Sequence, residues 1–307
     1  GPTTIQLSRS SPLGAVSIVP ELHALVQVEG EDHSVFLLSE SDSGYYRSDE
    51  LPLNPAIGYR IRIAASNNKV YTSTFRSVIL TPEIDSLSWE QDEKGVAIFV
   101  NAHDPKNTTR YYKWDYEETW EFKSAYKTNA RYYKTGEVIQ GTEVMMIEKN
   151  YNYALIDSMY TCWKSKKSSG ITIGTTEKLS ADIVHLPIIY HPEGAWPLSF
   201  LYSVEVTQYG LGKEAYEFYE KMKKNTESLG SVFDAQPSFI KGNIGCTTDP
   251  LEQVIGFMEV SAGYRKRVFI ANTELPNWNY HTGCTRGFSC QRSIYFGIPA
   301  FRCSFRI

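Results

Sequence analysis

Hydrophobic and polar side chains alternate most regularly between Arg110 and Phe122, where the sequence reads RYYKWDYEETWEF. Successive side chains of an extended backbone point to opposite faces, so this spacing of two predicts a β-strand and not a helix. Most even positions carry aromatic side chains that would line a sheet interior, namely Tyr112, Trp114, Tyr116, Trp120 and Phe122. The odd positions would face water, because they carry Lys113, Asp115, Glu117, Thr119 and Glu121.

Glu118 alone interrupts the aromatic row. A carboxylate on that face must find Arg, Lys or backbone donors, or its pKa must rise, because an unpaired buried charge is costly. Two interpretations stay open: a structural salt bridge at a strand end, and a carboxylate that belongs to a functional site. Glu117 and Glu121 share the outer face, where we expect solvated side chains and not a glycosidase pair.

The N-terminal part of the chain predicts a run of short strands separated by turns, from residue 3 to residue 80. Turns are expected from Asp42 to Tyr46 and at Asn67-Asn68, because Asn tolerates a positive φ. A new alternating pattern begins after Thr81-Pro82. We therefore predict a small antiparallel β-sandwich over residues 1-82, of the prealbumin or carboxypeptidase-regulatory type.

Residues 83-307 predict a larger β domain. Strands expected at Leu87 to Glu90 and Val96 to Asn101 precede the aromatic strand, an order typical of immunoglobulin or fibronectin sandwiches. One amphipathic helix is predicted near residues 211-228, where apolar residues recur at spacings of three and four: Leu211, Ala215, Phe218, Tyr219 and Met222. The predicted fold class is mostly β, a two-domain β-sandwich protein with an immunoglobulin-like C-terminal domain and one helix.

Composition narrows the class of partner. The chain has 307 residues, of which 42% are hydrophobic, enough to bury real cores. Its net charge is −4 with both signs mixed along the chain, so we expect no basic face and no nucleic-acid partner. Because no run of about 18 apolar residues occurs and the first residues lack the zones of a signal peptide, we expect a soluble chain whose leader was removed or lies upstream.

Five cysteines are too few for a dense disulfide framework: Cys162, Cys246, Cys284, Cys290 and Cys303. Cys284 and Cys290 lie in a polar loop, GCTRGFSC, which would close into a short disulfide in an oxidising compartment. Their gaps to His281 and Cys303 do not follow a zinc-knuckle pattern, and two oxygen-rich turns, at residues 40–44 and 103–107, lack the ligand spacing of a calcium loop. We therefore predict no metal and no cofactor.

Motifs of the common catalytic classes are missing. The six histidines do not form the helical pair of a zinc protease, and no GxSxG elbow occurs. Gly210 to Lys213 resembles part of a phosphate loop, but it lacks the first Gly and the hydroxyl residue after Lys, so we interpret it as the entry to the helix. No catalytic residue is assigned, and we predict a protein that is not an enzyme.

An aromatic loop near the C-terminus is the best candidate for a recognition surface. It contains Trp278, Tyr280 and His281, followed by Arg286. Aromatic and Arg side chains dominate recognition hot spots, and aromatic rings also stack on sugars. We predict that these four residues contact a ligand or partner.

Several long blocks, in order, carry a resemblance beyond composition. They include TPEIDSLSW, VNAHDPKNTTRYYKWDYEETWEF, YTCWKSKKSSGITIGTTEKLSAD and YSVEVTQYGLGKEAYEFYEKMKKNTESLGSVFDAQPSFIKGNI. Together they resemble a family of Bacteroidota outer-membrane lipoproteins of unassigned function. Members usually begin with a lipobox cysteine, which this chain lacks, and often have a cysteine-rich loop near the C-terminus, a place that Cys284 and Cys290 occupy here. The family brings no catalytic residues with it.

The resemblance implies a role at the cell surface. Genes of the family often accompany TonB-dependent transporters that import glycans or peptides. We therefore expect a non-enzymatic, lipid-anchored outer-membrane protein that binds a glycan or peptide, or docks onto a TonB-dependent transporter and its surface lipoprotein partner. The alternatives are a hydrolase of peptides or glycans, with Glu118 or His103 in a cleft, and a purely structural or adhesive envelope module.

Overall fold

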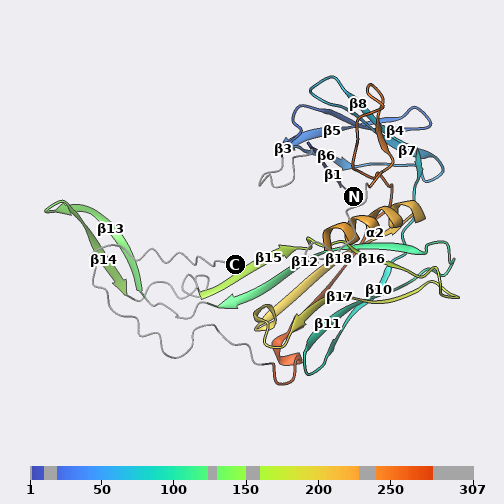
Figure 1. Cartoon of the computed structure of the whole chain (residues 1–307). Helices are drawn as coiled ribbons and strands as arrows, with labels where there is room; N and C mark the ends of the chain where they lie inside the picture. Colours follow the sequence, from blue (N-terminus) through green and yellow to red (C-terminus); the bar gives the residue numbers. More distant parts are fainter. Residues whose placement is uncertain (1, 10–18, 124–129, 150–159, 228–239, 279–307) are drawn as a thin grey trace, which may run out of the picture.

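The computed structural model describes residues 2–9, 19–123, 130–149, 160–227 and 240–278, and its described part is mostly β with antiparallel sheets (Figure 1). This confirms the predicted fold class in its main feature. The immunoglobulin-like detail stays a prediction.

The N-terminal sheet is built from short strands joined by tight turns. Its strands lie in the order β1 (Pro2–Gln6), β6 (Tyr45–Glu50), β5 (Val35–Asp42), β4 (Leu25–Gly30), β7 (Gly58–Ala64), β8 (Val70–Ser73) and β19 (Ile244–Cys246), with β9 (Arg76–Ser77) also paired to β7. Short strands β2 (Ser8–Arg9) and β3 (Val19–Pro20) pair separately. Alternate residues of β4 and β7 form the core, and the predicted Asn turn is present, with Asn68 at a φ of 63°.

A segment from late in the chain completes this sheet. Strand β19 pairs antiparallel with β8, Val260 packs in the N-terminal core, and Ile79 forms a parallel bridge with Ser261. The Asn243 side chain fixes the segment by bonding both the N–H and the carbonyl of Met258. The division at residue 82 stays a prediction about folding units, and this segment crosses it.

Two further sheets pack face to face around a second core. One contains β10 (Ile84–Gln91), β11 (Gly95–His103) and β17 (Ile183–Pro192). The other contains β15 (Thr161–Lys167), β12 (Tyr111–Lys123), β18 (Leu201–Leu211) and β20 (Tyr264–Ala271), with β16 (Thr172–Thr175) also paired to β12. Strand β12 is the predicted aromatic strand, and its Tyr112, Trp114 and Trp120 are buried between the sheets as the alternation requires.

The predicted helix is confirmed as α2 (Lys213–Glu227), which lies over the outer face of the five-stranded sheet, between this sheet and the N-terminal one (Figure 1). Ala215 and Phe218 are buried, and the Tyr216 ring lies 5.1 Å from that of Tyr111 on β12. There are two single turns of 3-10 helix: η1 (Trp196–Leu198) precedes β18, and η2 (Asn272–Glu274) follows β20.

A β-hairpin extends away from the sandwich (Figure 1). Its strands β13 (Ala130–Ile139) and β14 (Thr142–Lys149) pair with each other and, among the described residues, join no other sheet. Gln140 and Gly141 form the turn with φ values of 49° and 78°.

Candidate functional site

Glu118 lies between the two sheets of the sandwich and connects them. Its side chain points from β12 into the core, and the residue is 6% exposed. The hydroxyl of Tyr202, on β18, donates a hydrogen bond of 2.9 Å to Oε1 of Glu118. Nε2 of His191, on β17 of the opposite sheet, lies 2.9 Å from the same oxygen. The carboxylate is thus shared by both layers of the sandwich.

The electrostatics of this cluster favour the ionised carboxylate. Burial raises the pKa of Glu118, but the His191 imidazole and the Tyr202 hydroxyl outweigh it and hold this pKa below its ordinary value. Burial, followed by the charge of Glu118, raises the pKa of Tyr202, so the phenol keeps the proton that it donates. Nε2 of His191 has no aligned hydrogen-bond acceptor, so its 2.9 Å contact with Glu118 is an ion pair only when the imidazole is protonated.

This geometry matches the salt-bridge interpretation of Glu118 more closely than that of a site carboxylate, although the pair is buried in the core and not at a strand end. The carboxylate is enclosed by core side chains of both sheets, and it lines neither of the two concave surfaces described below. His191 carried no signal in the sequence that tied it to Glu118, because the two residues meet only when β17 packs over β12.

His103 lies in a different setting, at the exposed end of β11. Its Nδ1 is 2.7 Å from Oδ2 of Asp85, and both side chains are about half exposed. The hydrogen bond to Asp85 and the charge of that carboxylate raise the pKa of His103. His103 lines neither concave surface. A hydrolase built on Glu118 or His103 stays an untested alternative.

The oxygen-rich turn after β11 is held by its own donors. The Asp104 carboxylate accepts the backbone N–H groups of Lys106, Thr108 and Thr109 and the Thr108 hydroxyl, at 2.8 to 2.9 Å. Burial raises the pKa of Asp104, but the four donors lower this pKa by more, and the result is a pKa of about 2. Neighbouring Asp182 accepts from the Tyr112 hydroxyl. Within the described residues no group of three or more His, Cys, Asp or Glu could hold a metal ion.

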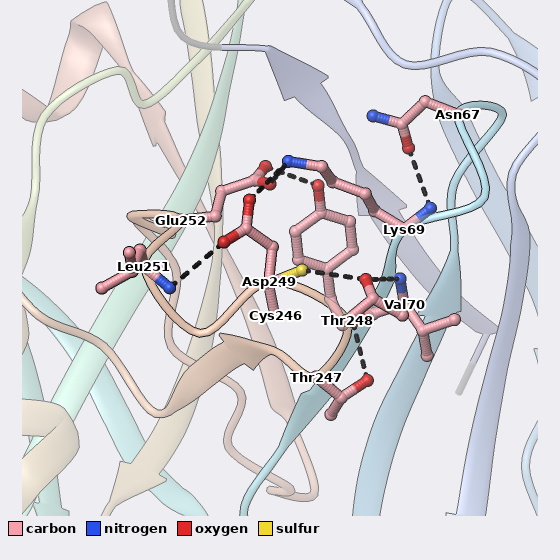
Figure 2. A network of polar contacts seen from close by, with 10 residues as sticks. Asn67, Lys69, Val70, Cys246, Thr247, Thr248, Asp249, Leu251 and Glu252 are labelled. Atoms are coloured by element: carbon pink, nitrogen blue, oxygen red, sulfur yellow. Dashed lines mark hydrogen bonds and ion pairs between the residues drawn. The ribbon is translucent and has the colours of Figure 1, made fainter.

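A third polar network fastens the late segment to the N-terminal sheet (Figure 2). Nζ of Lys69, in the β7–β8 turn, contacts Asp249 at 3.0 Å and also Glu252. The Tyr71 hydroxyl donates to Glu252 at 2.6 Å. These carboxylates raise the pKa of Lys69, and burial together with Glu252 raises the pKa of Tyr71 to about 12. The lysine charge therefore joins two parts of the chain that lie about 180 residues apart in sequence.

The predicted contact loop is only partly described. Trp278 is 6% exposed and belongs to the sandwich core, and its Nε1 lies 3.4 Å from the carbonyl oxygen of Ala195. Its ring therefore offers little surface to a partner. Tyr280, His281 and Arg286, and the predicted disulfide between Cys284 and Cys290, lie outside the described residues, so these assignments stay predictions.

The described part of the structure includes two concave surfaces. One, of about 530 Å³, lies where β10, the start of the β17–η1 connection and η2 meet, and it is lined by Trp89 and by acidic side chains that include Glu93 and Glu193. The other, of about 510 Å³, lies beside the β4–β5 turn. There the Arg60 guanidinium pairs with Glu29 at 2.8 Å and covers the Phe75 ring.

Sequence reasoning missed two exposed features. One is the β13–β14 hairpin. The other is the outer face of β12 beyond α2, which the alternation had marked only as solvated. Small hydroxyl residues at the centre of this face, such as Thr119, were the one feature of the sequence that distinguished it from an ordinary charged surface.

Comparison with known proteins gives one family. Residues 1–267 match the family described as "Domain of unknown function (DUF4249)". No curated protein gives a match to the chain. Among solved structures, the major pilin subunit of Bacillus cereus is similar at 9% identity and a TM-score of 0.14, over 68% of this chain and 65% of the pilin. The chain thus spans less than two thirds of the pilin, and so low a TM-score supports no argument. No helix in the described part is long and apolar enough to cross a membrane.

Proposed function

The chain belongs to the DUF4249 family, and from this membership we propose a non-enzymatic, lipid-anchored protein of the outer-membrane surface that serves a TonB-dependent nutrient transporter. In this proposal the protein docks onto the transporter and its surface lipoprotein partner and assists the uptake of a glycan or peptide. The resemblance of its sequence blocks to Bacteroidota outer-membrane lipoproteins supports the anchor and the location. The β13–β14 hairpin supports the docking.

The hairpin has features that suit a contact with a partner protein. Val138 and Ile139, next to its turn, and Met146 on β14 expose large apolar side chains. A two-stranded hairpin that stands alone is at best marginally stable in water, so its apolar side chains favour a partner that covers them. Burial of one such side chain contributes roughly 1.5–3 kcal/mol, so two or three of them contribute a substantial part of a stable contact.

Co-purification from the native outer membrane tests the proposal. A tagged, lipid-anchored protein is extracted in a detergent that keeps barrel complexes intact, and the co-purifying proteins are identified by mass spectrometry. We expect a TonB-dependent barrel in stoichiometric amount with the unaltered chain. A V138S/I139S variant should lose it, because the hydroxyl side chains remove the apolar contact.

The matched control is Leu251→Ser, which changes a 92% exposed apolar side chain in the segment that follows β19. This variant should retain the barrel. Recovery of the anchored protein alone would refute docking, and full recovery with V138S/I139S would remove the hairpin from the interface.

A further inference from the structure

Helix α2 covers only one end of the outer face of the five-stranded sheet. Its Tyr216 packs on Tyr111, at the beginning of β12, and its Tyr219 ring lies 5.7 Å from Nζ of Lys113. Beyond these residues the face continues along β12 from Glu117 to Lys123 without the helix (Figure 1). This stretch, together with the paired residues of β15, β18 and β20, is called the open face below.

A row of small hydroxyl residues crosses the centre of the open face. Thr119 on β12 is paired with Ser165 on β15 and with Ser203 on β18. Directly paired residues of antiparallel strands share one face, and the hydroxyls of Thr119 and Ser165 lie 2.9 Å apart. Arg267, on β20, donates to the Ser203 hydroxyl at 3.0 Å. Thr119 and Ser165 thus present adjacent hydroxyl groups, whereas Ser203 is 5% exposed and its hydroxyl is occupied by the Arg267 guanidinium.

Large aromatic side chains stand on the two outer strands beside this row, one of them directly in line with it and the other two residues along β15 from Ser165. Phe269, on β20, is paired with Ser203 and is 57% exposed. Trp163, on β15, is paired with Glu121 and is 55% exposed. Strands β15 and β20 are three strand spacings apart, which corresponds to about 14 Å. Two exposed rings, on β15 and on β20, therefore stand on either side of the polar side chains of β12 and β18.

The charges on the open face neutralise one another. Glu121 pairs with Lys123 at 3.4 Å, and Glu205 pairs with Arg267 at 3.2 Å. Glu117 lies directly across from Lys167 in the register of β12 and β15. A charged ligand would have to compete with these pairs and would meet no excess of opposite charge.

We propose that the open face binds a neutral oligosaccharide, which lies across the strands from Trp163 to Phe269. A sugar ring has an apolar face of C–H groups that packs on an aromatic ring, and hydroxyl groups at its edge that exchange hydrogen bonds with Ser and Thr. Both kinds of contact are present in the required order, ring, hydroxyl row, ring. This inference rests on the proposed function, for which it names the class of ligand. Its test needs no transporter, so the result does not depend on whether the protein docks onto one.

Binding is measured with the full chain on an array of neutral oligosaccharides and in native gels that contain dextran, galactomannan, xylan or laminarin. The charged probe is polygalacturonate. We expect retention by at least one neutral glycan and none by polygalacturonate. Trp163→Ala and Phe269→Ala should each weaken the retained glycan about tenfold, and the double variant should abolish binding.

The matched control is Tyr190→Ala, which removes a 53% exposed ring from β17, in the other sheet. It should bind as the unaltered chain does, and circular dichroism and thermal melting verify that each variant is folded. Absence of retention by every neutral probe would overturn the proposal. Binding that survives in the folded double variant, or that is lost equally in Tyr190→Ala, would also overturn it.

Discussion

Two polar networks connect distant parts of this chain, and they differ mainly in how much water reaches them. The cluster of Glu118, His191 and Tyr202 is enclosed between two sheets. The network of Lys69, Asp249 and Glu252 lies at the surface, where the side chains are 28% to 43% exposed. Both bring carboxylates within hydrogen-bond distance of side chains from a distant part of the chain. Water screens the surface charges whether or not they are paired, whereas the buried groups have only each other.

Glu118→Ala should have the largest effect. It removes the acceptor of the buried Tyr202 hydroxyl and the carboxylate that contacts the His191 imidazole, and loss of one partner of such a buried group costs about 3–5 kcal/mol. Urea unfolding at neutral pH measures this loss. Tyr202→Phe removes a single hydrogen bond to the carboxylate and should cost about 2 kcal/mol.

Glu117→Ala is the control, because Glu117 is the sequence neighbour on the outer face; it should change the free energy of unfolding by about 0.5 kcal/mol or less. If Glu118→Ala cost no more than this control, the buried cluster would not stabilise the sandwich.

A second buried carboxylate, Asp104, should make the free energy of unfolding depend on pH in the acid range. The pKa of Asp104 is lowered in the folded chain from 3.8 to about 2, so its contribution to stability is complete above the unfolded value and is lost as pH falls toward 2. This shift corresponds to about 2 kcal/mol. The free energy of unfolding is measured at pH 6, 4, 3 and 2 for the unaltered chain and for Asp104→Asn. The difference between the two proteins should shrink by about that amount as the pH falls from 6 to 2. A constant difference across this range would contradict the assignment.

Lys69→Met should have the smallest effect. Its two carboxylate partners are exposed enough to be solvated without it, so the unfolding midpoint should fall slightly at low salt and stay unchanged in 0.5 M NaCl, where surface ion pairs are screened. Lys221→Met, on the outer part of α2, is a control for loss of one positive charge. A large, salt-independent loss with Lys69→Met would place this network in the same class as Glu118.

The sequence predicts best where one strand or helix contains all the information. The alternation in β12 predicts its conformation and its buried face, and it also shows that Glu118 needs a partner. It cannot identify His191, because that contact depends on how β17 packs over β12. The helix could be predicted for the same local reason, since four of its five apolar residues lie within α2, whereas Leu211 is the last residue of β18.

Long-range arrangements were beyond the reach of these patterns. Nothing in residues 244–246 indicates that they pair with β8, because a three-residue strand has too short a pattern. Trp278 was predicted to contact a partner as part of an aromatic loop, yet its ring lies in the sandwich core, with Nε1 3.4 Å from the carbonyl oxygen of Ala195. The contact residues beyond it stay predictions.

Strand β19 comes late in the sequence, and this position affects the order in which the parts of the chain can fold. Strand β8 ends at Ser73, and its partner begins at Ile244, so synthesis must continue through most of the sandwich before the pair can form. Closure of so long a loop is slow, and until it happens the edge of β8 presents unpaired backbone groups that other chains could join. The N-terminal sheet, although it is made first, is therefore among the last parts of the molecule to be completed.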